Sequence, residues 1–327
     1  MSPFDVEVLR GRLDAVDPAA WDALTARPPA SLCGSRRWSE AAFAVAHPDA
    51  EPLLVAIEVE GRLVGLLPLA LHRGGPHPVV SFAGAPHNDL NDLMVSPGAP
   101  STVATAALDA LDALCGEGWE VRLDAVDPDG ALFGADSAGP GPRLEWDGDE
   151  PAPAIDLGGP WRAASSGRRR RQWGRRLRRL QEAHDIAFGW IEGAQMVDEL
   201  AAFGRLREAR RLVTGRAPDQ PPVPFYEDVV RRLHGSGGCA YAEMSVDGTP
   251  VARDLYLLDP PVALMWLRAL DPEWQRFPCG HLLLRETAES LAVDSYETLD
   301  LGRGAEAYKF FFGADDRELL SARGAAR

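Results

Sequence analysis

Lysine is almost absent from this sequence of 327 residues. Lys309 is the only one among its 34 lysine and arginine residues. The compact ammonium of lysine and the planar fork of arginine bind different partners, so the two are not interchangeable at a specific site. A lysine retained against such a preference for arginine suggests that arginine does not serve at that position.

Cysteine and long apolar runs are also scarce. The four cysteines are scattered without C-x-x-C spacing, which argues against a zinc site or a disulfide framework and favours reduced thiols. No stretch approaches the roughly 18 to 20 apolar residues of a membrane span, and the first residues lack the pattern of a secretory signal. We therefore expect a cytoplasmic protein that does not cross a membrane.

The charge balance is acidic, with a formal net charge of −15. Such a field repels phosphate and argues against general binding to nucleic acids or anionic membranes. One segment runs against this balance: Arg168 to Arg179, RRRRQWGRRLRR, holds eight arginines in twelve residues. Its apolar residues recur at helical spacing, so the segment predicts a basic surface helix. Either it pairs with surplus carboxylates or it binds a phosphorylated partner.

The first half of the chain shows alternating strand and helix signals. Two apolar runs, PLLVAIEV and RLVGLLPLAL, are joined by Glu60-Gly61 and predict a hairpin. A helix is expected after Ser101, and a strand at 120–124. Residues 127–153 are rich in Gly, Pro, Asp and Ala and predict a long loop or interdomain connection.

The second half repeats this kind of pattern. We expect helices at about 161–182, 195–212, 222–234 and 279–293, and strands at about 186–191, 239–246, 250–258, 262–269 and 297–301. Strands and helices mixed in this way predict an α/β fold with a mixed sheet in each part. The expected domains are 1–150 and 151–327.

Two segments of the second half could carry chemistry. After the strand at 262–269, a loop leads to a helix that starts near Pro278-Cys279-Gly280. A helix N-terminus of this kind can bind an anion, and Arg276 could contact a phosphate oxygen; an ordinary turn is the alternative. After the strand ending at Asp300, a glycine-containing loop leads to an expected short helix from Gly304 to Phe312, at the edge where α/β sheets bind ligands.

The second of these segments also carries a family resemblance. GRGAEAYKFFFG resembles the GRG-x-E-x-YK signature of the CelD/BcsL-like acyltransferases of the GNAT superfamily. GRLVGLLPLAL, and SFAG followed by NDLNDLMVSPG, are similar to the N-terminal half of that family. The resemblance implies two GNAT-like acyltransferase domains in tandem, similar to Fem-type aminoacyltransferases.

The resemblance also implies an acyl-donor site. In GNAT proteins the pyrophosphate of acyl-CoA binds the amides of a Q/R-x-x-G-x-G/A loop, and a tyrosine often protonates the departing thiolate. Tyr308 has the matching place, and the loop corresponds to residues 275–281, although it contains Pro278 and a single glycine. The residues implied for the donor are Arg276, Cys279, Gly280, His281, Leu282, Arg303 and Lys309, of which Arg303 and Lys309 could instead bind an acceptor carboxylate. An alternative is that Arg303, Glu306 and Lys309 form a structural salt-bridge network.

The remaining catalytic and substrate assignments are less specific. With Tyr308 as the acid, the candidates for the base are Glu306, Asp254 and His281. The polar loop 87–92 could bind the acceptor through Asn88, Asp89 and Asp92, together with Trp266, although loops of this composition often form turns. No metal is expected.

The resulting hypothesis is an N-acyltransferase. It would move an acyl group from acetyl-CoA or another acyl-CoA to the amine of a small molecule or cell-envelope precursor by direct attack. Two alternatives stay open: an aminoacyl-tRNA-dependent transferase, with tRNA bound through Arg168 to Arg179, and a non-catalytic GNAT-like binding protein. The sequence does not indicate an oligomeric state.

Overall fold

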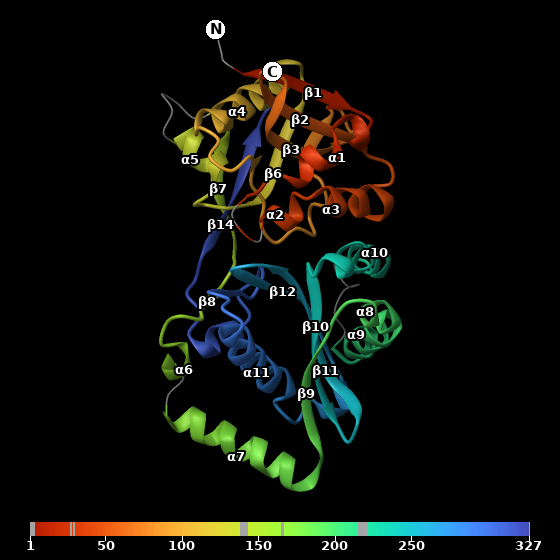
Figure 1. The fold of residues 1–327 in the computed structure, drawn as a ribbon, viewed down its shortest axis with the longest axis vertical. Coiled ribbons are helices and arrows are strands. Elements are labelled where there is room, and N and C mark those ends of the chain that lie inside the picture. Colours follow the sequence, from red (N-terminus) through yellow and green to blue (C-terminus); the bar gives the residue numbers. More distant parts are fainter. Residues whose placement is uncertain are drawn as a thin grey trace. The chain divides into compact units, whose positions relative to one another are not determined.

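The computed structural model describes residues 4–26, 28, 30–137, 143–164, 167–214 and 221–326. By its contacts the chain divides into two units, which we describe separately (Figure 1). Unit 1 comprises Met1–Glu150 with Glu318–Arg327, and unit 2 comprises Pro151–Arg317. Among the described residues, no helix is long and apolar enough to cross a membrane.

Unit 1 contains a mixed sheet in the order β1-β2-β3-β4-β6-β14-β7, with β5 paired to β3. The strands are β1 (Asp5–Arg10), β2 (Glu51–Val59), β3 (Arg62–His72), β4 (Val79–Phe82), β5 (Met94–Val95), β6 (Glu120–Val126), β7 (Glu145–Pro151) and β14 (Glu318–Gly324). The predicted hairpin is β2–β3, and Glu60 and Gly61 both have positive φ angles in its turn. That geometry matches the right-handed twist of the two strands.

The helices of unit 1 are α1 (Pro18–Asp22), α2 (Ala30–Cys33), α3 (Arg36–Ala41), α4 (Thr102–Gly116) and α5 (Ala131–Ser137). The alternation of β2 divides its side chains between two cores. Leu53, Val55 and Ile57 join the core that contains α4, whereas Leu54 and Ala56 join the core around Trp21. Helices therefore cover both faces of β2.

The segment expected to be a loop is more ordered than its composition suggests. Residues 127–153 contain α5 and β7. Trp146 on β7 donates a hydrogen bond from Nε1 to Asp136 on α5 at 2.7 Å. The predicted second domain also loses its last segment, because β14 pairs with β6 and belongs to unit 1.

Unit 2 contains a sheet in the order β8-β13-β12-β11-β10-β9. Its strands are β8 (Ala154–Asp156), β9 (Ile186–Ile191), β10 (Cys239–Val246), β11 (Thr249–Asp259), β12 (Val262–Leu270) and β13 (Thr298–Asp300). Strands β9 to β12 form antiparallel pairs, whereas β12 and β13 are parallel. This parallel pairing joins only Val262–Leu264 to Thr298–Asp300, so the rest of β12 has no partner on β13.

The helices of unit 2 are α6 (Trp161–Ala164), α7 (Gly167–Ala183), α8 (Gln195–Asp198), α9 (Leu200–Thr214), α10 (Val223–Leu233) and α11 (Cys279–Val293). Figure 1 shows α11 on one side of the sheet and α8 to α10 on the other. The single helix expected at 161–182 is α6 followed by α7. The last short helix is a 3₁₀ turn, Lys309–Phe312, so Glu306 and Tyr308 precede it. The prediction of a mixed α/β fold is confirmed.

Candidate functional site

A cavity of about 450 Å³ lies in unit 2 at the end of β12. It is bounded by the C-terminal half of β12, the loop that follows, the start of α11, and residues of α7 and α9. Its lining residues are Arg176, Arg210, Val213, Val251, Arg268, Leu270, Asp271, Pro272, Trp274, Gln275, Arg276, Phe277, Pro278, Cys279, Gly280, His281 and Tyr308.

The topology explains why the cavity forms here. The cavity residues Arg268 and Leu270 lie on the part of β12 that β13 does not pair with. The chain leaves β12 through the loop and enters α11 at Cys279, while Tyr308 arrives from the segment after β13. Ligands in α/β sheets bind beyond the carboxyl ends of strands in such places.

The start of α11 adds backbone donors to this cavity. Pro278 is the N-cap, and the amides of His281 and Leu282 both donate to its carbonyl oxygen. The first amides of a helix, here those of Cys279 and Gly280, have no acceptor within their own helix. Gly280 also lets the start of α11 pack closely against Leu270 of β12, because a Cβ at this position would lie 3.1 Å from Leu270 Cδ2.

Four arginines from different parts of the fold line the cavity. They are Arg176 of α7, Arg210 of α9, Arg268 of β12 and Arg276 of the loop. Asp271 is the one acidic residue among the lining residues described, and its carboxylate accepts a hydrogen bond from the Glu273 amide at 2.9 Å. The cavity is therefore strongly positive and suits a ligand that carries several anionic oxygens.

Tyr308 lies against the guanidinium of Arg268. The Cζ atom of Arg268 is 4.8 Å from the centre of the Tyr308 ring. Burial raises the pKa of Tyr308 to about 12, although the charge of Arg268 acts in the opposite direction. The phenol is therefore protonated at neutral pH and can donate a proton.

Asp254 faces Arg268 from the neighbouring strand. It lies directly opposite Arg268 in the β11–β12 register. Arg268 donates from Nε to Oδ1 at 2.8 Å and from Nη2 to Oδ2 at 2.6 Å. The side chain of Asp254 is completely buried. An incoming amine cannot reach this carboxylate in that arrangement, so the geometry disfavours Asp254 as the base.

His281 is the other titratable group at the cavity wall. Its ring centre is 6.3 Å from that of Tyr308 and 5.2 Å from that of Phe311. Burial lowers the pKa of His281 to about 4, with further lowering by the charges of Arg268 and Arg176. The imidazole is neutral at neutral pH and only weakly basic.

Most of the predicted donor loop reaches the cavity. Arg276, Cys279, Gly280 and His281 all line it. Burial raises the pKa of the Cys279 thiol to about 11, so the side chain is not a thiolate. Leu282 does not line the cavity: its side chain is buried in the core of unit 2 and its amide donates to the Pro278 carbonyl, which disfavours its predicted role.

The other two residues predicted to bind the acyl donor, Arg303 and Lys309, lie in a loop that the Lys309 side chain holds closed. The ammonium of Lys309 donates to the carbonyl oxygens of Gly302, Arg303 and Gly304 at 2.9, 2.5 and 3.2 Å. It also pairs with Glu306 at 3.0 Å. An ammonium has three protons, and these four acceptors occupy them. The geometry therefore favours the structural alternative for Lys309 and Glu306, and Arg303 belongs to the same loop.

The predicted acceptor residues are spread over both units. Asn88 is buried in unit 1, where its amide donates to the Ala83 carbonyl and to Asn91 at 2.9 and 2.7 Å. The Asp92 carboxylate accepts the Ala131 and Leu132 amides at the start of α5, at 2.7 and 3.0 Å. Both side chains thus hold unit 1 together, which disfavours acceptor binding by them. The role of the half-buried Asp89 stays a prediction.

Trp266 belongs to unit 2. It is buried in β12 and packs edge-to-face on Phe225, with 6.1 Å between ring centres. The register of β12 shifts at this point, because Leu255 is opposite Leu267 and Tyr256 is opposite Met265. Trp266 is therefore the extra residue of a β-bulge.

Arg268 and Arg210 line the cavity although the sequence did not lead us to expect them there. Arg268 had a readable signal, since it is a charged residue inside the apolar run VALMWLRAL, and buried arginines are rare unless they are paired. Arg210 had no such signal, because it is one of several arginines on α9.

The arginine-rich segment forms most of α7. Among the side chains that are described, those of Arg171, Arg175, Arg176, Arg178 and Arg179 are exposed. Leu177 and Leu180 pack into the core of unit 2. The side chains of Arg168 to Arg170 and of Trp173, which the prediction also included, lie outside the description. Within the described residues, no group of three or more His, Cys, Asp or Glu side chains could hold a metal.

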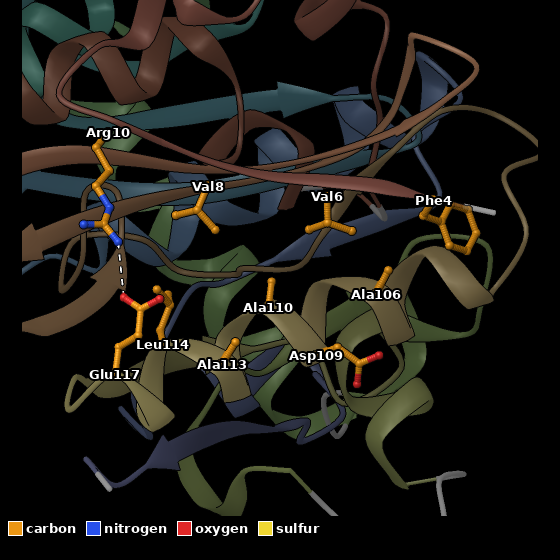
Figure 2. A pocket seen from close by; sticks show the side chains of 10 residues that line it. All are labelled: Phe4, Val6, Val8, Arg10, Ala106, Asp109, Ala110, Ala113, Leu114 and Glu117. Atoms are coloured by element: carbon orange, nitrogen blue, oxygen red, sulfur yellow. Dashed lines mark hydrogen bonds and ion pairs between the residues drawn. The ribbon is translucent and has the colours of Figure 1, made fainter. Parts of the chain in front are cut away.

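Unit 1 has a groove of its own, shown in Figure 2. Val6 and Val8 of β1 face Ala110 and its neighbours on α4 across a space of about 390 Å³. Arg10 and Glu117 pair at one end at 3.4 Å. Its described lining is mainly apolar, whereas the cavity of unit 2 brings four arginines and a tyrosine together, so the groove is a weaker candidate.

Comparison with known families agrees with this choice. Residues 167–310 match the model of the acetyltransferase (GNAT) domain. The match spans every residue that lines the unit 2 cavity. No curated protein matches the chain.

Solved structures resemble the chain at low sequence identity. The crystal structure of FemX has a TM-score of 0.68 and 11% identity, and the similarity covers 98% of this chain and 97% of FemX. A conserved protein of unknown function from Bacteroides thetaiotaomicron has a TM-score of 0.59 and 10% identity, with 100% of both chains covered. L-PGS from Bacillus licheniformis has a TM-score of 0.52 and 14% identity, with 81% of this chain and 82% of that one covered. These likenesses concern the fold.

Proposed function

Taking the chain as a GNAT-type acyltransferase, we propose that it transfers an acyl group from an acyl-CoA to an amine in the unit 2 cavity. One observation carries the proposal: a single cavity of about 450 Å³ brings together four arginines, the start of α11 and the protonated Tyr308. The arginines and the first amides of α11 suit the phosphates of CoA. The resemblance to the CelD/BcsL-like acyltransferases supports the same reading.

In this proposal Tyr308 supplies the proton that the leaving group needs. The amine nitrogen attacks the thioester carbonyl carbon, the C–S bond breaks, and the sulfur takes the electron pair together with a proton from Tyr308. The phenolate is then reprotonated by the proton that the amine loses. The phenol is the right form for this task, because the pKa of Tyr308 is about 12.

Among the three candidates that the sequence offers, none stands out as a strong base. Asp254 is enclosed by Arg268, Glu306 is paired with Lys309, and His281 has a pKa of about 4. We therefore propose that the acceptor amine enters in its neutral form or loses its proton through water. The acceptor is a small molecule or cell-envelope precursor with a primary amine, and we place the reaction in the cytoplasm, where acyl-CoA is available.

A second candidate donor is aminoacyl-tRNA, and the exposed face of α7 favours it. Arg176 lines the cavity, while Arg171, Arg175, Arg178 and Arg179 extend the positive charge along the helix. A polynucleotide could follow such a row, and its binding would weaken steeply with salt.

The test is to titrate the purified chain with acetyl-CoA, longer acyl-CoAs and aminoacyl-tRNA at two salt concentrations. An acyl-CoA that binds the native state should raise the melting temperature by mass action, with about 2.7 kcal/mol of stabilisation at 100 times Kd. Free thiol should then appear when a suitable amine is added. Binding of aminoacyl-tRNA without binding of any CoA ester would replace the acyl-CoA donor with the second candidate.

A further inference from the structure

Arg268 is a charged side chain in an unusually enclosed position. Only 8% of its side chain is exposed, and it emerges from the apolar strand β12. Removing a guanidinium from water costs several kcal/mol unless ion pairs and hydrogen bonds compensate. A pair of apolar side chains would fill the same space without that cost. The position therefore calls for a role beyond packing.

The hydrogen bonds of Arg268 leave one of its amino groups free. Nε and Nη2 face Asp254, and Nη2 is also 3.3 Å from the sulfur of Met265. Within the described part of the chain, Nη1 makes no hydrogen bond. It lies beside the start of α11, because a Cβ built on Gly280 would be 3.5 Å from it. Arg268 and Gly280 both line the cavity, so Nη1 is placed to donate into it.

The neighbouring backbone supplies few donors of its own. Pro278 has no amide hydrogen, and the amides of His281 and Leu282 are already bonded to the Pro278 carbonyl. The Cys279 and Gly280 amides remain from the first turn. An anion at the start of α11 therefore needs a side chain to complete its contacts, and Nη1 of Arg268 is adjacent.

We propose that Arg268, held in place by Asp254, is an anion-binding residue at the start of α11, where Nη1 and the first amides of the helix receive a phosphate or carboxylate oxygen. Asp254 is then a positioning residue, because it turns Nε and Nη2 away and leaves Nη1 for the ligand. The proposal rests on the proposed function for its biological ligand. The acyl donor would bring a phosphate, whereas an acidic acyl group or acceptor would bring a carboxylate.

The experiment measures binding of inorganic pyrophosphate, acetate and acetyl-CoA by calorimetry. Arg268→Met removes the guanidinium but leaves Asp254 buried and unpaired. The double variant Arg268→Met/Asp254→Leu removes both charges and keeps the volume filled. The matched controls are Arg285→Met and Arg285→Met/Glu286→Leu, which change the same charges at a partly exposed pair on α11.

Both Arg268 variants should weaken binding of the preferred anion by at least about tenfold, as expected for a lost charge-assisted hydrogen bond. The controls should change it by less than about twofold. Weaker binding of pyrophosphate and acetyl-CoA identifies the phosphate, whereas weaker binding of acetate alone identifies a carboxylate. Equal affinity of the Arg268 variants and the wild type overturns the proposal.

Crystals of the wild-type protein soaked in pyrophosphate give a measurement that needs no variant. An oxygen atom within about 3 Å of Nη1 supports the proposal, and an anion bound only elsewhere overturns it. The two proposals can fail separately. If the wild type binds pyrophosphate through Arg268 but no acyl-CoA, the donor assignment fails and the anion-binding residue stands.

Discussion

Arg268 and Asp254 face each other across β12 and β11 and form two parallel hydrogen bonds of 2.8 and 2.6 Å. This pairing assigns separate tasks to the two residues. The carboxylate is completely buried and faces its partner, so it orients the guanidinium. The guanidinium lies over Tyr308 and borders the cavity, so it is the member of the pair that a ligand can reach.

We expect the chain to lose more stability when one member of the Arg268–Asp254 pair is removed than when both are replaced. Asp254→Ala leaves a buried guanidinium without its counterion and should lower the free energy of unfolding by about 3–5 kcal/mol. The double variant Asp254→Leu/Arg268→Met should stay within about 1–2 kcal/mol of the wild type, because apolar side chains of similar size replace the pair. Urea unfolding measures both, and equal losses would contradict the paired arrangement.

Tyr308→Phe should affect turnover rather than binding. The change removes only the hydroxyl and keeps the ring beside Arg268. Loss of a general acid lowers kcat by about 10²- to 10⁴-fold, while the Kd for acyl-CoA should stay within about twofold of the wild type. The measurement is thiol release from acetyl-CoA with an amine that the wild type accepts. Unchanged kcat would remove Tyr308 from the chemistry.

Much of this site could be predicted from local sequence signals. The strand, loop and helix start that end at Gly280 follow from apolar runs and turn residues, and the strands from β10 to β12 and helix α11 lie where the sequence predicts them. The role of Asp254 could not be predicted in this way, because it depends on which residue lies opposite on β12. That register includes the bulge at Trp266, and a bulge shifts every later pairing by one residue.

Composition also misleads where long-range pairing decides the structure. Residues 127–153 have few bulky side chains, yet Trp146 anchors β7 through Asp136. β14 belongs to the second half of the sequence, yet it pairs with β6 of unit 1. A local pattern cannot predict such a return, because an isolated short strand has no signal for its partner. The composition of loop 87–92 likewise does not reveal that Asn88 and Asp92 form hydrogen bonds inside unit 1.

His281 should make the free energy of unfolding depend on pH between about pH 6.5 and pH 4. Its pKa is about 4 in the folded chain, against 6.5 for the unfolded residue, mainly because of burial. The unfolded chain then binds the proton more readily than the folded chain. The contribution of His281 to the free energy of unfolding is therefore fully present above pH 6.5 and falls as the pH decreases toward 4. After a discount for partial exposure we expect a loss of about 1–2 kcal/mol. His281→Gln should flatten this part of a urea-unfolding series, and an unchanged slope would contradict the assignment.

Asp92→Ala tests whether the polar loop of unit 1 is structural. The carboxylate accepts the first two amides of α5, so its loss should destabilise the chain by about 1–3 kcal/mol. The Kd for acyl-CoA and the KM for the amine should stay unchanged in the folded protein. A raised KM with normal stability would instead restore the predicted role in acceptor binding. Asp89→Ala is the matched variant in the same loop.

Lys309→Arg should destabilise the chain although it preserves the charge. The ammonium donates to three carbonyl oxygens of its own loop and is only 3% exposed. A guanidinium is larger and planar, and it cannot direct its donors to three oxygens around one point. We expect a loss of about 1–3 kcal/mol for Lys309→Arg and about 2–4 kcal/mol for Lys309→Met, which leaves the carbonyls without a donor.

Glu306→Gln is the control: that side chain is 45% exposed, so its salt bridge should contribute less than about 1 kcal/mol. Thermal unfolding ranks the three variants. If Lys309→Arg were as stable as the wild type but bound acyl-CoA tenfold more weakly, Lys309 would be a ligand of the donor and the three carbonyl contacts would be secondary.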